Sequence, residues 1–233
     1  MGNKSVNVEI KGVHKKIKGT EVLRDINLEL EGGRVYGLKG KNGSGKTMLM
    51  RAVCGLIVPT SGTITINGEV LGKDISFPRS VGILIENPSF IAGYTGMKNL
   101  QVLAMIQNRI GDEEIRRAIE MVGLDPDDKR TYKKYSLGMK QRLGIAAAIM
   151  ESPDIVILDE PINALDEEGA KLVREILKEQ KERGALCIIA CHDSEELNFL
   201  SDEIIEIYEG KIVGQESCKT EKTLRKLPED SEN

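Results

Sequence analysis

The chain has 233 residues, of which 40% are hydrophobic, so it can form one large or two small globular units with a packed core. Its 33 Lys and Arg residues are outnumbered by 37 Asp and Glu residues, and this net charge of −4 argues against nucleic acid or anionic lipid as a direct ligand. No uninterrupted apolar run approaches the ~20 residues that cross a bilayer, and residues 1–12 lack the apolar core of a secretion signal. We therefore expect a cytosolic protein.

The first part of the chain predicts antiparallel β-strands. Residues 6–10 (VNVEI) alternate strictly between apolar and polar side chains, and residues 24–33 (RDINLELEGG) alternate before two glycines. Residues 62–68 (GTITING) end in an Asn-Gly pair of the hairpin type. These segments indicate a small antiparallel β subdomain.

The pattern changes to helices between residues 95 and 150. In residues 112–124 (DEEIRRAIEMVGL) apolar side chains recur at helical spacing behind an acidic first turn. Residues 154–161 (DIVILDEP) and 185–192 (ALCIIACH) then read as buried strands on either side of an amphipathic helix over residues 169–184. This alternation is typical of parallel α/β units.

We therefore predict one α/β domain over residues 1–233. Its core with the β subdomain comprises residues 1–94 and 151–214, and a helical subdomain is inserted over residues 95–150. Residues 215–233 are charged and poor in apolar side chains, so we predict a loosely packed tail there.

A phosphate-binding loop is predicted at residues 40–47 (GKNGSGKT), between an apolar strand at 34–40 and a helix at 46–56 that Gly55 can end. Glycines let backbone N–H groups close around phosphates, Lys46 can reach the β and γ groups, and Thr47 can hold Mg²⁺. A chance glycine-rich turn is the alternative, but the strand and helix favour phosphate. The candidate binding residues are Gly40, Asn42, Gly43, Ser44, Gly45, Lys46 and Thr47.

Two adjacent acids end the apolar run at residues 155–160. Asp159 would lie beside the Mg²⁺, and Glu160 could orient or deprotonate water, which indicates hydrolysis. Idle solvated carboxylates would be the alternative if the phosphate loop were missing. The sequence has no Asn-Lys-x-Asp guanine reader, so ATP is the expected nucleotide.

A second anion cradle is indicated at residues 135–142 (YSLGMKQR). Ser136 can cap a helix that begins near Gly138, and such a helix start offers a hydroxyl, free N–H groups and a favourable dipole. A helix cap with no further role is the alternative. The position of this segment between the phosphate loop and the two acids favours a site.

These motifs resemble those of the ATP-binding subunits of ABC transporters, over nearly all of residues 6–213. GKNGSGKT corresponds to Walker A, YSLGM stands in place of the LSGGQ signature, and IVILDE corresponds to Walker B. Residues 164–166 (ALD) correspond to the D-loop and His192 to the switch histidine. The resemblance implies the ABC ATPase fold: a P-loop NTPase (RecA-like) core, an antiparallel β subdomain and an inserted α-helical subdomain.

The resemblance also implies a mechanism. Two subunits pack head to tail around two ATP, so Ser136 and Gly138 of one chain contact the nucleotide held by the other. Lys46, Glu160 and His192 are then the expected catalytic residues, with ATP and Mg²⁺ bound. An ordinary buried histidine is the alternative for His192, and Asp166 can act as a helix cap as well as line the dimer contact.

The chain departs from the family at two positions. Glu86, in VGILIENPSF, stands where most members have a glutamine that touches Mg²⁺ and the membrane partner; it can still bind metal, or be a plain surface glutamate. Ile17 lies near the place of the aromatic residue that stacks on adenine, and His14 is the one flat ring nearby. We therefore expect weak or poorly base-selective nucleotide binding.

The segments IENPSF and YSLGMKQR are similar to those of the ATPases of bacitracin and lantibiotic-type peptide export and resistance systems. We expect a subunit that hydrolyses ATP on the cytosolic face of the membrane and drives a separate permease, for export. The alternatives are a soluble ABC-type ATPase acting as an assembly or repair scaffold, and a regulatory ATPase that uses slow hydrolysis as a timer.

Overall fold

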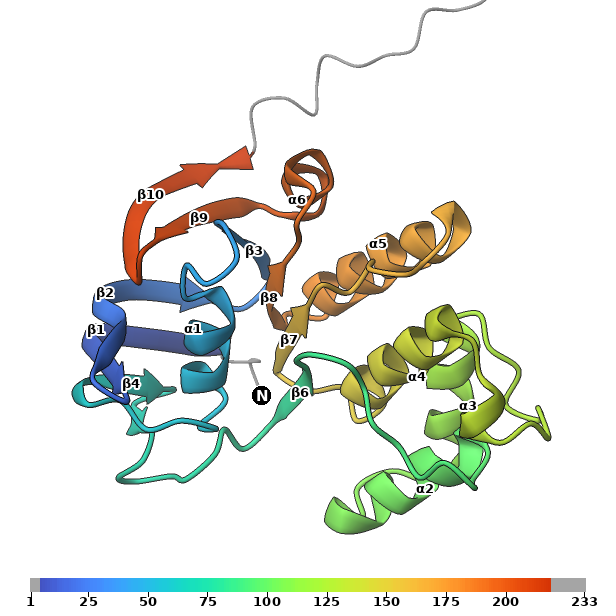
Figure 1. Ribbon diagram of the computed structural model, residues 1–233. Helices are drawn as coiled ribbons and strands as arrows, with labels where there is room; N and C mark the ends of the chain where they lie inside the picture. Colours follow the sequence, from blue (N-terminus) through green and yellow to red (C-terminus); the bar gives the residue numbers. More distant parts are fainter. Residues whose placement is uncertain (1–4, 219–233) are drawn as a thin grey trace, which may run out of the picture.

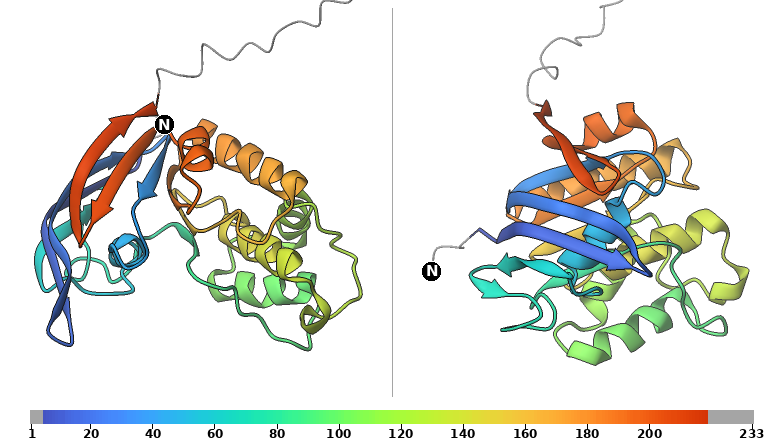
Figure 2. Two further views of the ribbon diagram at one scale, coloured as in Figure 1. Left: turned by 45° about the horizontal axis from the view of Figure 1, so that its top comes forward. Right: turned by 60° about the vertical axis from the view of Figure 1, so that its left-hand side comes forward.

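The computed structural model describes residues 5–218, which form two β-sheets with helices between and beside them (Figures 1 and 2). The smaller sheet is antiparallel and has the strand order β2-β1-β4-β5. Its strands are β1 (Asn7–Ile17), β2 (Thr20–Glu31), β4 (Ser61–Ile66) and β5 (Glu69–Val70). Asn67 and Gly68 join the last two strands with φ angles of 52° and 87°, which confirms the predicted Asn-Gly hairpin.

The larger sheet has the order β10-β9-β3-β8-β7-β6, and its neighbouring strands are parallel except for the antiparallel β9–β10 pair. Its strands are β3 (Arg34–Lys39), β6 (Val81–Leu84), β7 (Ile155–Asp159), β8 (Leu186–Ala190), β9 (Glu203–Tyr208) and β10 (Lys211–Ser217). Because parallel strands end at the same edge, the loops after β3, β7 and β8 meet there.

The helices are divided between the two faces of the larger sheet. Helix α1 (Lys46–Val53) lies between the two sheets, as Figures 1 and 2 show. The others lie on the opposite side: α2 (Gly96–Gln107), α3 (Asp112–Met121), the short 3-10 helix η1 (Tyr132–Lys134), α4 (Leu137–Ile149), α5 (Glu167–Glu182) and α6 (Ser194–Leu200). Helices α2 to α4 connect β6 to β7, which places the helical subdomain where the sequence predicts an insertion.

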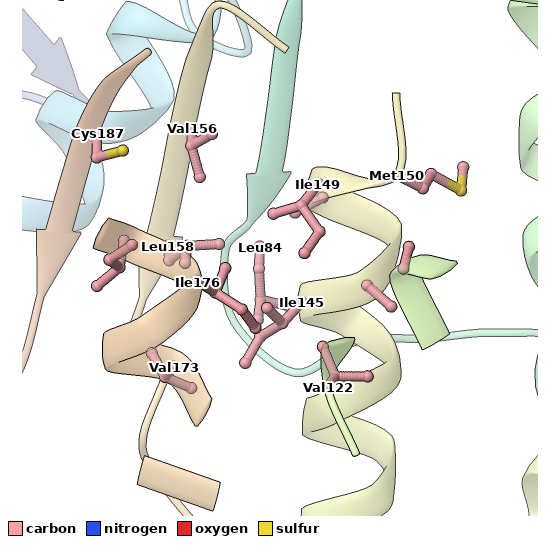
Figure 3. Close-up of a cluster of buried hydrophobic side chains, with 14 of the residues drawn as sticks. Leu84, Val122, Ile145, Ile149, Met150, Val156, Leu158, Val173, Ile176 and Cys187 are labelled. Carbon is pink, nitrogen blue, oxygen red and sulfur yellow. The ribbon is translucent and has the colours of Figure 1, made fainter. Parts of the chain in front are cut away.

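Two hydrophobic cores follow from the alternation of side chains along the central strands. In β7, Ile155 and Ile157 face α1 and the smaller sheet, while Val156 and Leu158 face α4 and α5. Figure 3 shows the second core, in which Val156 and Leu158 lie among side chains of α4 and α5.

Each core also contains a buried thiol. Cys54, at the end of α1, belongs to the first core, and Cys187 of β8 belongs to the second. Burial raises the pKa of both thiols to about 12, because the apolar surroundings disfavour the thiolate.

The α/β fold with its antiparallel subdomain and helical insertion agrees with the prediction, and Gly55 follows α1 with a φ of 76°. The predicted tail does not begin at residue 215, since residues 215–217 pair with β9 as part of β10. Backbone hydrogen bonds hold this exposed edge strand, so it needs few apolar side chains. The rest of the predicted tail, residues 219–233, lies outside the described residues. Within residues 5–218, no helix is long and apolar enough to cross a bilayer.

Candidate functional site

The phosphate loop joins the end of β3 to the start of α1 and lies in close contact with the surrounding backbone. A side chain at Gly40 would collide with the carbonyl oxygen of Ile207. Gly45 has a φ of 114°, and a Cβ there would lie 3.0 Å from the carbonyl oxygen of Val22. Both positions therefore require glycine.

Lys46 closes this loop from within. Its side chain is buried, and its Nζ donates hydrogen bonds to the carbonyl oxygens of Gly40 at 2.7 Å and Lys41 at 3.3 Å. Helix α1 begins without a side-chain cap and without an acid in its first turn, so its first N–H groups are available to an anion. The buried hydroxyl of Ser44 has no hydrogen-bond partner among the described residues. These features fit a bound phosphate chain.

Asp159 meets the phosphate loop at the start of α1. The hydroxyl of Thr47 donates to its Oδ2 at 2.7 Å, so the ends of β7 and of the loop share one polar contact. A hydroxyl beside a carboxylate fits Mg²⁺, which usually takes one or two protein ligands together with phosphate oxygens. When bound, Mg²⁺ would neutralise negative charge on the phosphates. In the described part of the chain, no group of three or more His, Cys, Asp or Glu residues could hold a metal alone.

Glu160 follows Asp159 with a φ of 52°, a left-handed conformation that is uncommon outside glycine. Its N–H donates to the carbonyl oxygen of Ala190 at 2.9 Å. Its Oε2 accepts the N–H of His192 at 3.2 Å, and its Oε1 lies 3.5 Å from the Nε2 of His192. Burial raises the pKa of the Glu160 carboxyl, against the opposing effect of His192, which makes it a better proton acceptor near neutral pH.

His192 itself lies at the surface, with 59% of its side chain exposed. The alternative of an ordinary buried histidine is therefore wrong.

Glu86 lies in the loop after β6, and its side chain is bonded to Arg51 of α1 and not to Thr47 or Asp159. Its carboxylate forms an ion pair of 2.5 Å with Arg51, and 66% of its side chain is exposed. The arginine charge offsets the negative charge that Glu86 brings to this edge of the sheet. Its role as a metal ligand stays a prediction.

Ile17 lies at the end of β1, where it pairs with Thr20 at the start of β2 and is 38% exposed. Strand β2 then reaches the phosphate loop through the carbonyl of Val22. The imidazole of His14 is bonded to Glu21 through Nδ1 at 2.9 Å. The β1–β2 turn is thus joined to the phosphate loop by one strand, and the contact of Ile17 with the base stays a prediction.

The second cradle is built at the start of α4. Ser136 is its N-cap, and the Ser136 Oγ accepts the N–H of Met139 at 3.2 Å, which confirms the predicted cap. Because the hydroxyl accepts this bond, its proton is free to be donated to an anion. Beside it lies a cavity of about 820 Å³, lined by residues 136–139, Arg142, the D-loop residues 164–166 and members of the loop 123–130. No residue of the phosphate loop lines this cavity.

Two residues beyond the signature were not assigned roles from the sequence. Gln141 is buried and donates from Nε2 to the carbonyl oxygens of Glu160 at 2.9 Å and Pro161 at 3.4 Å. Arg142 donates to the Oδ1 of Asp166 at 2.8 Å. Polar residues on a helix usually face solvent, so the signal in the sequence was only their position next to the signature.

Asp166 is the N-cap of α5, which confirms the predicted helix cap. Its Oδ1 accepts the N–H of Gly169 at 2.9 Å. This backbone bond, together with Arg142, lowers the pKa of the Asp166 carboxyl.

Comparison with known proteins finds relatives that are all described as ATP-binding proteins of transporters. Residues 23–163 match the family model described as ABC transporter. The chain is 50% identical, over 88% of its length and 94% of the relative's, to YybJ of Bacillus subtilis, described as an uncharacterized ABC transporter ATP-binding protein. It is 40% identical to the bacitracin transport ATP-binding protein BcrA of Enterococcus faecalis, over 88% of this chain and 68% of that one. It is 36% identical to the lantibiotic transport ATP-binding protein SrtF of Streptococcus pyogenes, over 94% and 95%.

Solved structures have the same fold. The ATP-binding subunit of an ABC transporter superposes with a TM-score of 0.81 at 25% identity, covering 90% of this chain and 89% of that one. A dimeric post-hydrolysis ATP-binding cassette with bound ADP and Pi gives 0.82 at 21% identity, over 91% and 99%. With the phosphate loop, the paired acids and the signature cradle in place, the chain belongs to the ABC transporter family, as an ATP-binding subunit with ATPase activity.

Proposed function

We propose that this chain pairs head to tail with a second copy, or with a homologous subunit, around two ATP and drives a separate membrane permease. The observation that carries the proposal is the cavity at the signature. It contains the cap of α4 and the D-loop but none of the phosphate loop, so one chain offers a complete phosphate loop and a separate, open cradle. A second chain that places its phosphate loop against this cradle would complete both sites. The solved cassette with ADP and Pi is likewise described as dimeric.

Each side chain then has a task in hydrolysis. Lys46 and the N–H groups of α1 bind the phosphates, and Thr47 and Asp159 hold Mg²⁺. Glu160 takes a proton from the attacking water, and His192 contacts the γ-phosphate beside it. The Ser136 hydroxyl and the backbone at Gly138 approach the same phosphate from the opposing chain.

The dimer serves as the switch. ATP stabilises the closed pair because it contacts both chains, and loss of the γ-phosphate removes the contact to the signature. ATP binding and hydrolysis thereby alternate between a closed and an open pair, which is the motion that a permease can use.

The proposed docking surface for the permease is formed by α2 and residues 86–96. It carries exposed apolar side chains, among them Ile91, Tyr94, Met105 and Ile106. Two of these residues lie just before α2 and two in its last turn, and exposed apolar side chains on a segment of this kind are candidates for contact with another protein. We propose a location on the cytosolic face of the membrane. The bacitracin and lantibiotic transport relatives favour export and a peptide antibiotic as the transported class.

Dimerisation is tested with Glu160→Gln, which keeps the shape of the side chain but cannot accept the proton. With Mg-ATP, light scattering should show a stable dimer, and turnover should fall by about 10²–10⁴-fold, the range of a general base. The control is the same variant carrying Lys46→Ala, which should stay monomeric because it lacks nucleotide. A monomer of Glu160→Gln at saturating Mg-ATP would contradict the proposal.

The permease is tested by purification from the native cell. The tagged protein should copurify, from gently solubilised membranes, with comparable amounts of a polytopic membrane protein identified by mass spectrometry. Soluble partners alone, with the protein absent from the membrane fraction, would instead favour an assembly or repair scaffold.

A further inference from the structure

We propose that Gln141 is a positioning residue that couples the signature helix to Glu160 of the same chain. Contact at the signature, made with the nucleotide of the partner, would then set the geometry of this chain's own hydrolysis site. The inference rests on the proposed function, which gives Glu160 and the signature their roles.

The contacts of Gln141 lead directly to the backbone of Glu160. Gln141 lies two residues beyond the signature on α4, and its amide donates to the carbonyl oxygens of Glu160 and Pro161. On its other side, Glu160 is held by the bond from its N–H to Ala190 of β8. The left-handed conformation of Glu160 persists only where its surroundings enforce it. The bond to Ala190 restrains the backbone before its Cα, and the Gln141 amide, together with the N–H of Asn163 at 3.1 Å, restrains the carbonyl after it.

Helix α4 is well placed to transmit a displacement from one end to the other. Its Ile145 and Ile149 pack in the second core with Leu84 of β6 and Ile176 of α5 (Figure 3). Close-packed helices move as units rather than bending freely. A shift at Ser136 would therefore be felt one turn further along, at Gln141.

Two neighbouring contacts tie the same helix to the rest of the segment that follows Glu160. A Cβ at Gly138 would lie 3.0 Å from the carbonyl oxygen of Ala164, and Arg142 is bonded to Asp166. The first turns of α4 thus contact residues 160–166 at both ends and in the middle. Among these contacts, only that of Gln141 reaches the residue that acts on water.

The amide group suits this task chemically. It has two N–H donors, enough for two consecutive carbonyl oxygens, and it carries no charge that would compete with the Glu160 carboxylate. Methionine has a similar length but no donor. Gln141→Met therefore removes both hydrogen bonds while the new side chain fills about the same space. The Glu160 carbonyl would then keep only the N–H of Asn163, the Pro161 carbonyl would lose the bond from Gln141, and the backbone conformation would relax.

The test compares Gln141→Met with Gln180→Met in the full chain. Gln180 is also a buried glutamine, and its Oε1 accepts two hydrogen bonds from Arg183 at 2.8 Å and 2.6 Å, but it lies on α5 and is not bonded to Glu160. We expect Gln141→Met to keep the KM for ATP and to lower kcat by about 10- to 100-fold, the effect of a misplaced catalytic group. Gln180→Met should keep the parental kcat. Parental kcat in Gln141→Met, or an equal loss in Gln180→Met, would overturn the inference.

A second measurement separates positioning from general loosening of the fold. In the Glu160→Gln background, Gln141→Met should cause no further loss of kcat, because residues that act through one group are not additive. A loss by the same factor in both backgrounds would show a merely structural role. If Gln141→Met is insoluble, Gln141→Asn carries the same expectation, since its amide is one methylene too short.

The same experiment distinguishes the inference from the proposed function. Parental turnover in Glu160→Gln alone would refute the role of Glu160 and, with it, the proposed mechanism. Low turnover in Glu160→Gln with parental turnover in Gln141→Met would refute only the coupling.

Discussion

Helices α1 and α4 both begin at an anion cradle, yet their first residues differ. Helix α1 begins after Gly45, which has a left-handed backbone conformation and gives the helix no side-chain cap. The buried Lys46 side chain is hydrogen-bonded to the backbone of the preceding loop. Helix α4 begins after Ser136, whose hydroxyl caps it, and Leu137 beside the cap is 64% exposed. The first cradle is enclosed by its own chain, whereas the second opens onto a large cavity.

The difference indicates where each cradle finds its missing parts. The phosphate loop has its own cation, its own N–H groups and its metal contact at Asp159. Residues 136–139 contain no cation, and the two arginines that line the same cavity, Arg130 and Arg142, are each paired with an acid, Asp128 and Asp166. The second cradle can therefore complete a phosphate site but offers no cation of its own to form one alone. Nucleotide affinity should therefore depend mainly on the first cradle, and association and turnover on both.

The largest expected effect comes from a substitution in the first cradle, the phosphate loop. Lys46→Ala removes the cation that faces the phosphates, so ATP affinity and turnover should each fall by about 10²–10³-fold, as for loss of one charge-stabilising donor. Isothermal titration with Mg-ATP and steady-state kinetics measure the two effects. Lys41→Ala, at an exposed position of the same loop, is the control and should stay near the parent. Equal losses in both variants would mean that net charge, and not the position of Lys46, matters.

A smaller effect is expected from a substitution in the second cradle that leaves the first unchanged. Ser136→Ala should lower turnover by about 10-fold or more, through loss of a donor to the phosphate of the opposing chain, while the isolated chain keeps its ATP affinity. It also removes a helix cap, which costs about 1 kcal/mol of stability.

Thr95→Ala controls for that loss. The Thr95 hydroxyl caps α2 in the same way, accepting the N–H of Lys98. In the isolated chain it should match Ser136→Ala in thermal unfolding but retain turnover. If both variants lost turnover, the loss in Ser136→Ala would be explained by the missing helix cap, and Ser136 would have no separate role at the phosphate.

The pH dependence of turnover is a further way to compare the two cradles, because the titrating group, Glu160, lies at the phosphate-loop site and not at the signature. Since burial raises the pKa of Glu160, protonation should abolish turnover on the acidic side at a higher pH than for an ordinary carboxyl. His192 opposes this shift, so His192→Ala should move the acidic limb of kcat to still higher pH. His14→Ala, at the other histidine of the chain, should leave the limb in place. A limb that moves to lower pH in His192→Ala would contradict the assignment.

The smallest expected effect concerns the base. Ile17→Tyr should strengthen ATP binding about fivefold, equivalent to about 1 kcal/mol, if the ring stacks on adenine. Competition between ATP and GTP measures selectivity, with Ile17→Leu as the control. In the parent we expect similar affinity for both nucleotides, and a strong preference for ATP would refute that hypothesis.

Much of the fold and of the phosphate site could be predicted, because local rules determine them. Gly45 and Lys46 belong to a motif with fixed spacing, and the apolar run before Asp159 requires a buried strand. The cap at Ser136 follows from the preference of helix starts for small polar residues.

Other features depend on contacts between distant segments and leave no local signal. The bond of Gln141 to Glu160 spans 19 positions, and the ion pair of Arg51 with Glu86 spans 35. Strand β10 was missed because backbone pairing with β9, not apolar patterning, holds it. Such contacts require the three-dimensional arrangement of the strands and helices.

The thiols buried on the two faces of the larger sheet provide native probes of local opening. Cys54 ends the phosphate-loop helix, and Cys187 lies beneath α5, so an alkylating reagent reaches each only when its own layer opens. With thiol pKa values of about 12, the closed state should react very slowly, and labelling rates would follow transient exposure. Mapping the labelled peptides over time, with and without nucleotide, would tell which layer ATP makes more rigid.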